Sequence, residues 1–156
     1  MLVAGAQGLL VPRLEASGMA QGARIGSVVM FVRDLQTSVD FYQDVLALEV
    51  ADTSPTAALL RNRDGTQLLL RAMGRGAAHA LGSVGVQYIV WTAAGWEDLD
   101  RCERVLRQRA AYRETRRSGK VTLVEGRDPD DLVLMIGYPG PDQVPLHEIP
   151  VRIYGW

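Results

Sequence analysis

The sequence predicts one α+β domain built from two copies of a βαβββ module. A chain of 156 residues suits a single hydrophobic core. Short runs of aliphatic and β-branched residues, divided by turn residues, alternate with two stretches whose apolar residues recur every three or four positions. The order of these runs in residues 25–73 returns in residues 84–138, which indicates an internal repeat.

The limits of the domain follow from where this patterning begins and ends. We expect residues 1–24 to form a flexible N-terminal tail, with Met19 as the natural or an alternative start. Residues 74–83 contain three glycines and are predicted to link the modules. Residues 139–156 are predicted to form a C-terminal tail.

The first module is predicted as strand, helix and three strands. Its first strand is IGSVVMFV, residues 25–32, which is apolar and β-branched. Thr37 and Asp40 have capping-box spacing at the start of the helix. The apolar face of the helix holds Val39, Tyr42, Val45 and Leu46. Three strands separated by turn residues follow in residues 48–52, 56–62 and 66–72.

The second module repeats this order. VGVQYIVWT, residues 84–92, is the predicted first strand, and the helix is expected to begin at Trp96 or Glu97. The apolar face of this helix holds Leu99, Cys102, Val105 and Leu106, so Cys102 is expected to be a buried structural thiol. Three more strands are predicted in residues 111–117, 120–126 and 131–138.

Composition excludes several classes of partner. Seventeen basic and 18 acidic residues give a net charge of −1, so we expect neither nucleic acid nor an anionic membrane as a partner. The basic run in residues 104–117 is interpreted as a solvated face, and the glycines of residues 74–82 lack the strand and helix of a dinucleotide site. No apolar run approaches the roughly 18 residues of a spanning helix. A single cysteine fits a reducing cytoplasm.

A family resemblance joins these observations. The strand VMFV and the residues after it, together with the Asp128-Pro129-Asp130 turn, resemble the glyoxalase, bleomycin-resistance and extradiol-dioxygenase superfamily, also called vicinal oxygen chelate, over residues 25–138. The matching residues after the strand are Asp34, Leu35, Ser38, Phe41, Tyr42 and Leu46. The resemblance implies sheets curled around a cavity and a homodimer. It also implies, in catalytic members, a divalent metal at the cavity floor. The C-terminal tail is then a candidate cover for the cavity.

The positions that match the family's metal ligands hold unsuitable side chains. The resemblance places Ser27 and Gln87 at the first-strand positions, and Leu69 and Met135 at the last-strand positions. A divalent cation needs several converging donors, and one neutral amide does not supply them. We therefore expect no metal and no cofactor. The two histidines, His79 and His147, are candidates for an unconventional site with Glu125 or Glu148, although loop histidines are more often simply solvated.

Strand alternation predicts the lining of a ligand cavity. Side chains at every second position share one face of a sheet. The expected lining is Ser27, Val29, Phe31, Gln67, Leu69, Arg71, Gln87, Ile89, Trp91 and Met135, the last aligned with Val133 and Gly137. An apolar wall with a few polar groups is typical of a site for a small organic molecule. The large apolar members equally suit a core, Ser27 and Gln87 are able to bond each other, and Arg71 is either an anion clamp or a solvated side chain.

These observations lead to one hypothesis with two alternatives. The first is a metal-independent homodimer that binds a small apolar or aromatic organic molecule, for sequestration, resistance or an accessory biosynthetic role. The second is a glyoxalase-like or dioxygenase-like lyase, isomerase or dioxygenase that uses Gln87, Glu125 or His147, with an unconventional metal site or a metal recruited by the C-terminal tail. The third is a structural or regulatory dimer module with a filled cavity. The aromatic residues Trp96, Tyr138, Tyr154 and Trp156 are candidates for a lid or for a seal at the core edge.

Overall fold

The computed structural model describes residues 25–78, 86–140 and 143–144. Several predictions concern residues outside these ranges and remain predictions. They are the N-terminal tail with Met19, part of the linker with His79, and most of the C-terminal tail with His147, Glu148, Tyr154 and Trp156.

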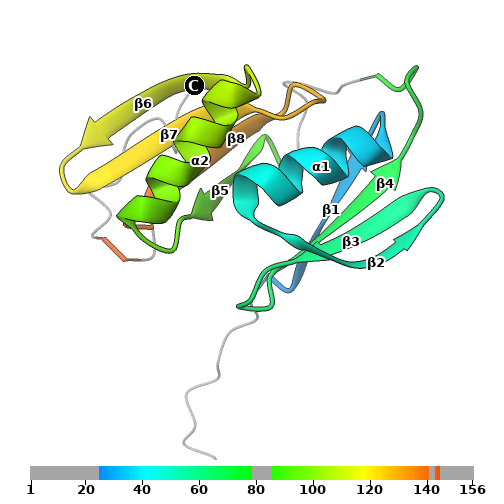
Figure 1. The fold of residues 1–156 in the computed structure, drawn as a ribbon, viewed down its shortest axis with the longest axis horizontal. Coiled ribbons are helices and arrows are strands. Elements are labelled where there is room, and N and C mark those ends of the chain that lie inside the picture. The colour runs from blue at the N-terminus through cyan, green and yellow to red at the C-terminus, as the bar shows by residue number, and fades with distance from the viewer. Residues whose placement is uncertain (1–24, 79–85, 141–142, 145–156) are drawn as a thin grey trace, which may run out of the picture.

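The element order confirms the predicted α+β class and the repeat of two βαβββ modules. The first module consists of β1 (Ser27–Val32), α1 (Leu35–Leu46), β2 (Glu49–Ser54), β3 (Ala57–Arg61) and β4 (Gln67–Ala72). The second consists of β5 (Tyr88–Thr92), α2 (Trp96–Gln108), β6 (Tyr112–Ser118), β7 (Val121–Arg127) and β8 (Val133–Tyr138). Both helices lie on the same side of the two sheets and pack against each other (Figure 1).

Each module forms a four-stranded sheet of its own, and the two sheets share one topology. The strand orders are β1-β4-β3-β2 and β5-β8-β7-β6. The first and last strands of each module pair in parallel, and the other neighbours pair antiparallel. A parallel pair requires a crossover connection, and each module's helix lies in that connection. The repeat in the sequence is therefore a repeat of complete folding units.

The N-cap of helix α1 lies three residues before the N-cap of the proposed capping box. The Asp34 side chain caps it by accepting a hydrogen bond of 3.0 Å from the backbone N–H of Thr37. The Asp40 carboxylate instead accepts a hydrogen bond of 2.7 Å from the side-chain amide of Gln36. The prediction of Thr37 as the capping residue was wrong, because Leu35 is already helical and Thr37 supplies one of the unpaired N–H groups of the first turn.

One hydrophobic core lies between the helices and the sheet faces that they cover. It contains Val45 and Leu106 from the helices, with Leu60, Leu70 and Ile136 from the strands, all almost fully buried. Cys102 is buried here as predicted, and its thiol donates to the carbonyl oxygen of Val45 at 3.2 Å. Burial of each large aliphatic side chain contributes about 1.5–3 kcal/mol, so this shared core holds the two modules together.

In the described ranges, no helix combines the length and apolar character needed to cross a membrane.

Candidate functional site

The first sheet has one face that the helices do not cover. Val28, Met30 and Val32 of β1 pack toward the helical core, so the alternate residues point the other way. The strand register pairs them with alternate residues of β4, as Ser27 with Gln67, Val29 with Leu69, and Phe31 with Arg71. All six are predicted site residues. The structure places them together on this surface, which we call the open face.

The open face exposes two large apolar side chains. Val29 is 56% exposed and Phe31 is 64% exposed, although both lie in a regular strand. Leu59 of β3 pairs with Leu69 and extends the apolar surface across the sheet. Contiguous exposed apolar residues typically mark a binding or association site.

In the second module, the predicted assignment of strand residues to sheet faces is wrong by one residue. Val90, not Ile89 or Trp91, is the register partner of Met135, while Trp91 pairs with Ile136 and packs toward the helical core. The prediction that Ile89 and Trp91 share a face with Met135 was therefore wrong. In the run VGVQYIVW, apolar residues occupy both the odd and the even positions, so the pattern does not show which side chains face the helices.

The corresponding face of the second sheet is a packed cluster. Met135 is fully buried together with Leu123 and Val133, and Tyr88, Val90 and Val144 pack against them. Gln87 directly precedes β5 and is only partly exposed. The packing favours a core role for Met135 over contact with a ligand.

The matching positions of the two modules do not fit a divalent metal. Ser27 and Gln67 in the first register correspond to Tyr88 and Val133 in the second, so Tyr88 replaces Gln87 as the counterpart of Ser27. The last-strand counterparts remain Leu69 and Met135. A hydroxyl, a phenol and two apolar side chains lack the imidazole and carboxylate donors that such an ion requires. Across the described ranges, no three histidine, cysteine, aspartate or glutamate residues gather into a possible metal site.

Glu125 is the buried carboxylate on the second sheet. It is 5% exposed, and its register partners are Met135 on β8 and Glu114 on β6. It therefore lies on the same face as Met135. Charged side chains are rarely buried without a partner, and Glu125 does interact with neighbouring groups.

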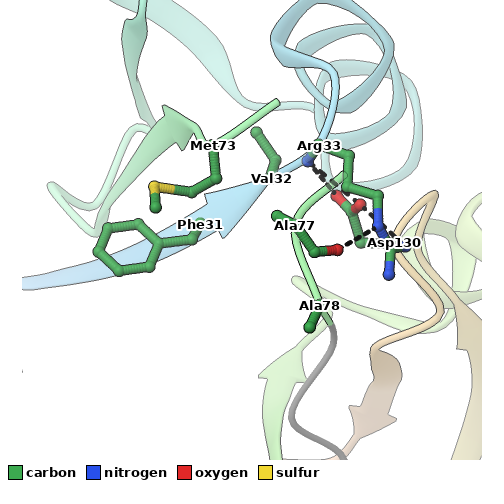
Figure 2. A pocket seen from close by; sticks show the side chains of 7 residues that line it. All are labelled: Phe31, Val32, Arg33, Met73, Ala77, Ala78 and Asp130. Atoms are coloured by element: carbon green, nitrogen blue, oxygen red, sulfur yellow. Dashed lines mark hydrogen bonds and ion pairs between the residues drawn. The ribbon is translucent and has the colours of Figure 1, made fainter. Parts of the chain in front are cut away.

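A pocket of about 310 Å³ lies beyond the end of the open face (Figure 2). Phe31 and Met73 stand on one side of it, and Ala77 and Ala78 stand on the other. Asp130 is the lining residue that comes from the second module. The remaining lining residues are Val32 and Arg33. Apart from Phe31, sequence reasoning did not assign these residues to a site, since their proximity depends on how the modules pack.

An ion pair across the modules forms one wall of this pocket. The Asp130 carboxylate accepts the backbone N–H of Arg33 at 3.2 and 3.3 Å, and the Arg33 guanidinium lies 3.5 Å from it. The guanidinium also donates to the carbonyl oxygen of Ala77 at 3.0 Å. This arrangement fixes the end of β1 against the turn before β8.

Asp128, two residues earlier in the same turn, is also held from both modules. Its Oδ1 accepts the backbone N–H groups of Asp130 and Leu132, and its Oδ2 accepts the hydroxyl of Tyr42 on α1. Burial raises the pKa of Asp128 above its ordinary value, and these hydrogen bonds partly oppose that rise. Burial and the nearby Asp128 carboxylate raise the pKa of Tyr42. The phenol therefore serves as a neutral hydrogen-bond donor.

Two of the four candidate lid residues lie together. Trp96 at the start of α2 is 51% exposed and meets Tyr138 at the end of β8 edge to face, with ring centroids 5.1 Å apart. This pair covers the edge of the core beneath α2, because Tyr138 packs against the core cluster. The contact favours the sealing role over a lid.

Comparison with solved structures finds the same fold. A glyoxalase/bleomycin resistance protein/dioxygenase domain from Frankia sp. EAN1pec is 21% identical, with a TM-score of 0.65, and covers 74% of this chain and 96% of its own. A lactoylglutathione lyase from Agrobacterium tumefaciens is 20% identical, with a TM-score of 0.59 and coverages of 75% and 94%. A glyoxalase/dioxygenase from Nostoc punctiforme is 16% identical, with a TM-score of 0.64 and coverages of 85% and 97%.

No curated protein matches the sequence. The family profile of the Glyoxalase/Bleomycin resistance protein/Dioxygenase superfamily matches residues 24–136, which include the first module and the second as far as Ile136 in β8. The chain therefore belongs to the glyoxalase/bleomycin resistance protein/dioxygenase superfamily, as the resemblance in its sequence indicated.

Proposed function

We propose that this protein binds a small apolar or aromatic organic molecule on its open face without using a metal, and that it acts in sequestration, resistance or as an accessory to biosynthesis. The observation that carries the proposal is Phe31. It is 64% exposed on the open face and also lines the pocket at the end of that face. A pocket of about 310 Å³ reaches the lower end of the size range for small-molecule sites.

Metal independence is supported by the donor chemistry of the corresponding positions. Ser27, Leu69, Tyr88 and Met135 offer no carboxylate and no imidazole. Elemental analysis of freshly purified protein tests this part, and we expect no stoichiometric divalent metal. One tightly held zinc, nickel, manganese or iron ion per chain would overturn it.

We further propose that a second copy of the chain covers the open face in a cytoplasmic homodimer, leaving a ligand cavity between sheets. The exposure of Val29 and Phe31 supports this, because burial of such side chains contributes about 1.5–3 kcal/mol each. Native mass spectrometry is expected to show a dimer for the wild type and a monomer for Val29→Asp. A monomeric wild type, or an unaffected variant, would overturn the assembly.

Ligand binding is tested with a neutral fluorescent probe, N-phenyl-1-naphthylamine. Phe31→Ser is expected to weaken probe binding at least fivefold, because it removes the exposed ring from the open face. Val50→Ser is the matched control, since Val50 is also an exposed apolar strand residue but pairs with Leu60, on the opposite face. Equal effects of the two substitutions would contradict the site. Absence of probe binding to the wild type would favour a structural or regulatory module with a filled cavity.

Glu125 supports a second candidate function, a lyase or isomerase with a carboxylate base. A base must lie within hydrogen-bonding reach of the substrate proton, and Glu125 is a buried carboxylate on the same sheet face as Met135. The assay is lactoylglutathione formation, the reaction class named for the Agrobacterium tumefaciens relative. If Glu125 is the base, Glu125→Gln lowers the rate at least 100-fold in a folded protein. An unchanged rate would exclude this role.

A further inference from the structure

Arg71 is a cation in an apolar part of the open face. Across the strands its register neighbours are Phe31 on β1 and Ala57 on β3. Along its own chain, the neighbours with the same alternation are Leu69 and Met73. Met73 continues the ladder beyond β4, because its N–H donates to the carbonyl oxygen of Val32 at 2.8 Å. The four nearest positions on this face of the sheet are therefore apolar, and none of them carries a charge that would neutralise Arg71.

The charge of Arg71 is also unmatched within the part of the chain that the structure describes. Arg33, Arg101 and Arg109 form ion pairs with Asp130, Asp98 and Asp44. Arg71 forms no hydrogen bond, ion pair or ring contact there, and its side chain is exposed. All five of its N–H donors are thus available to a ligand.

Arg71 does not itself line the pocket, but it is the register partner of Phe31, which does. Phe31 and Met73, two of the four neighbours of Arg71, form one side of the pocket (Figure 2). Neighbouring strands lie about 4.8 Å apart, so a ring against Phe31 brings its substituent within reach of the guanidinium. The pocket's own charged residues, Arg33 and Asp130, already neutralise each other at 3.5 Å. The unbalanced charge available to a ligand is therefore positive.

We propose that the preferred ligand is a small aromatic carboxylate, with its ring against Phe31 and Met73 and its carboxylate on Arg71. A guanidinium binds a planar carboxylate through two parallel hydrogen bonds, which supplies specificity as well as affinity. This inference rests on the proposed small-molecule function and makes Arg71 the residue that selects for the anion.

The test uses two probes with the same ring system, 2-naphthoate and neutral 2-naphthol, in isothermal titration calorimetry at pH 7. The wild type is expected to bind 2-naphthoate about tenfold more tightly, with the preference shrinking as salt is added. Arg71→Gln is expected to remove the preference by weakening 2-naphthoate binding about tenfold, with a much smaller effect on 2-naphthol. Because Arg71 is exposed, this substitution is expected to preserve the fold.

The matched control is Arg61→Gln. Arg61 is an exposed arginine whose register partner is Gln67, so it lies on the open face but away from the pocket lining. The control is expected to retain the preference for 2-naphthoate. A wild type that binds both probes equally, or a preference that survives Arg71→Gln, would overturn the role of Arg71 while leaving the proposed function standing. If the wild type binds neither probe, both the proposed function and this inference are wrong.

Discussion

The hydroxyl of Tyr42 donates a 2.8 Å hydrogen bond to Oδ2 of Asp128, which joins helix α1 of the first module to the turn before β8 of the second. The two residues are 86 positions apart, and the bond is buried. Together with the Arg33–Asp130 pair it fixes one module against the other. The pocket beside Phe31 depends on that fixed arrangement, because its lining comes from both modules.

Tyr42→Phe is expected to destabilise the fold by about 1–3 kcal/mol, because it removes one of the donors to a buried carboxylate. Urea unfolding followed by circular dichroism measures the loss. Tyr112→Phe is the matched control, since its hydroxyl bonds Thr115 at 3.1 Å in a less buried position. A Tyr42 variant no less stable than the Tyr112 variant would show that the contact between modules contributes little.

The raised pKa of Asp128 implies a contribution to the free energy of unfolding that declines as pH rises. Because burial raises its pKa above 3.8, the folded state holds the proton to a higher pH than the unfolded chain does. The contribution is complete below 3.8 and is lost as pH rises through the folded pKa. Asp128→Asn removes this titration while its amide oxygen still accepts from Leu132. We therefore expect the wild type to gain stability relative to the variant as pH falls from 7 toward 4, as measured by denaturant unfolding. A constant difference would contradict the raised pKa.

Cys102 is expected to be unreactive in the folded protein. Burial raises the pKa of its thiol from 9.0 to about 11, and the nucleophilic form is the thiolate. At pH 8, a chromogenic disulfide reagent should label the native protein far more slowly than the same protein in guanidinium chloride. Equal labelling rates in the two conditions would mean that the core opens readily around α2.

Gly126→Ala is expected to cost about 1–3 kcal/mol through overpacking. A Cβ at this position would lie 2.9 Å from a methyl carbon of Leu106 and 3.0 Å from the carbonyl oxygen of Ala111. That oxygen is held in place because it accepts the N–H of Arg127 at 2.8 Å. Gly137→Ala is the control, because its nearest neighbour would be at an ordinary 3.6 Å. Thermal unfolding of both variants tests the difference, and equal melting temperatures would refute it.

Asp34→Ala is expected to lower the melting temperature, whereas Asp34→Asn is expected to retain most of it because asparagine is an equally good helix cap. The hydrogen bond from the Thr37 backbone lowers the pKa of Asp34 below 3.8. Its stabilising effect is therefore present above 3.8 and is lost as pH falls through the lowered value. The wild type and Asp34→Asn should accordingly differ most below pH 3.8. If the wild type and Asp34→Asn melt at the same temperature as Asp34→Ala at pH 7, Asp34 does not cap the helix.

The sequence by itself determined the two modules, the order of their elements and the family. Helix and strand periodicities are local, so the spacing of Val39, Tyr42 and Val45 was sufficient to place α1. In β1 the alternation also predicted correctly that Ser27, Val29 and Phe31 share one face, as the register with β4 shows. Three residues at the expected metal positions, Ser27, Leu69 and Met135, were likewise readable from the chain alone, whereas the strand register replaced Gln87 by Tyr88 at the fourth.

Tertiary structure decided which face of β5 meets the helices and which residues surround the pocket. β5 is apolar at successive positions, so only its packing against the shared hydrophobic core assigned Trp91 to that core and Tyr88 to the other face. The pocket joins Phe31 to Asp130, which are distant in sequence, through hydrogen bonds between modules that no local pattern encodes. Local periodicity fixes which side chains share a face, but the relative packing of two modules depends on long-range contacts that form only when the chain folds.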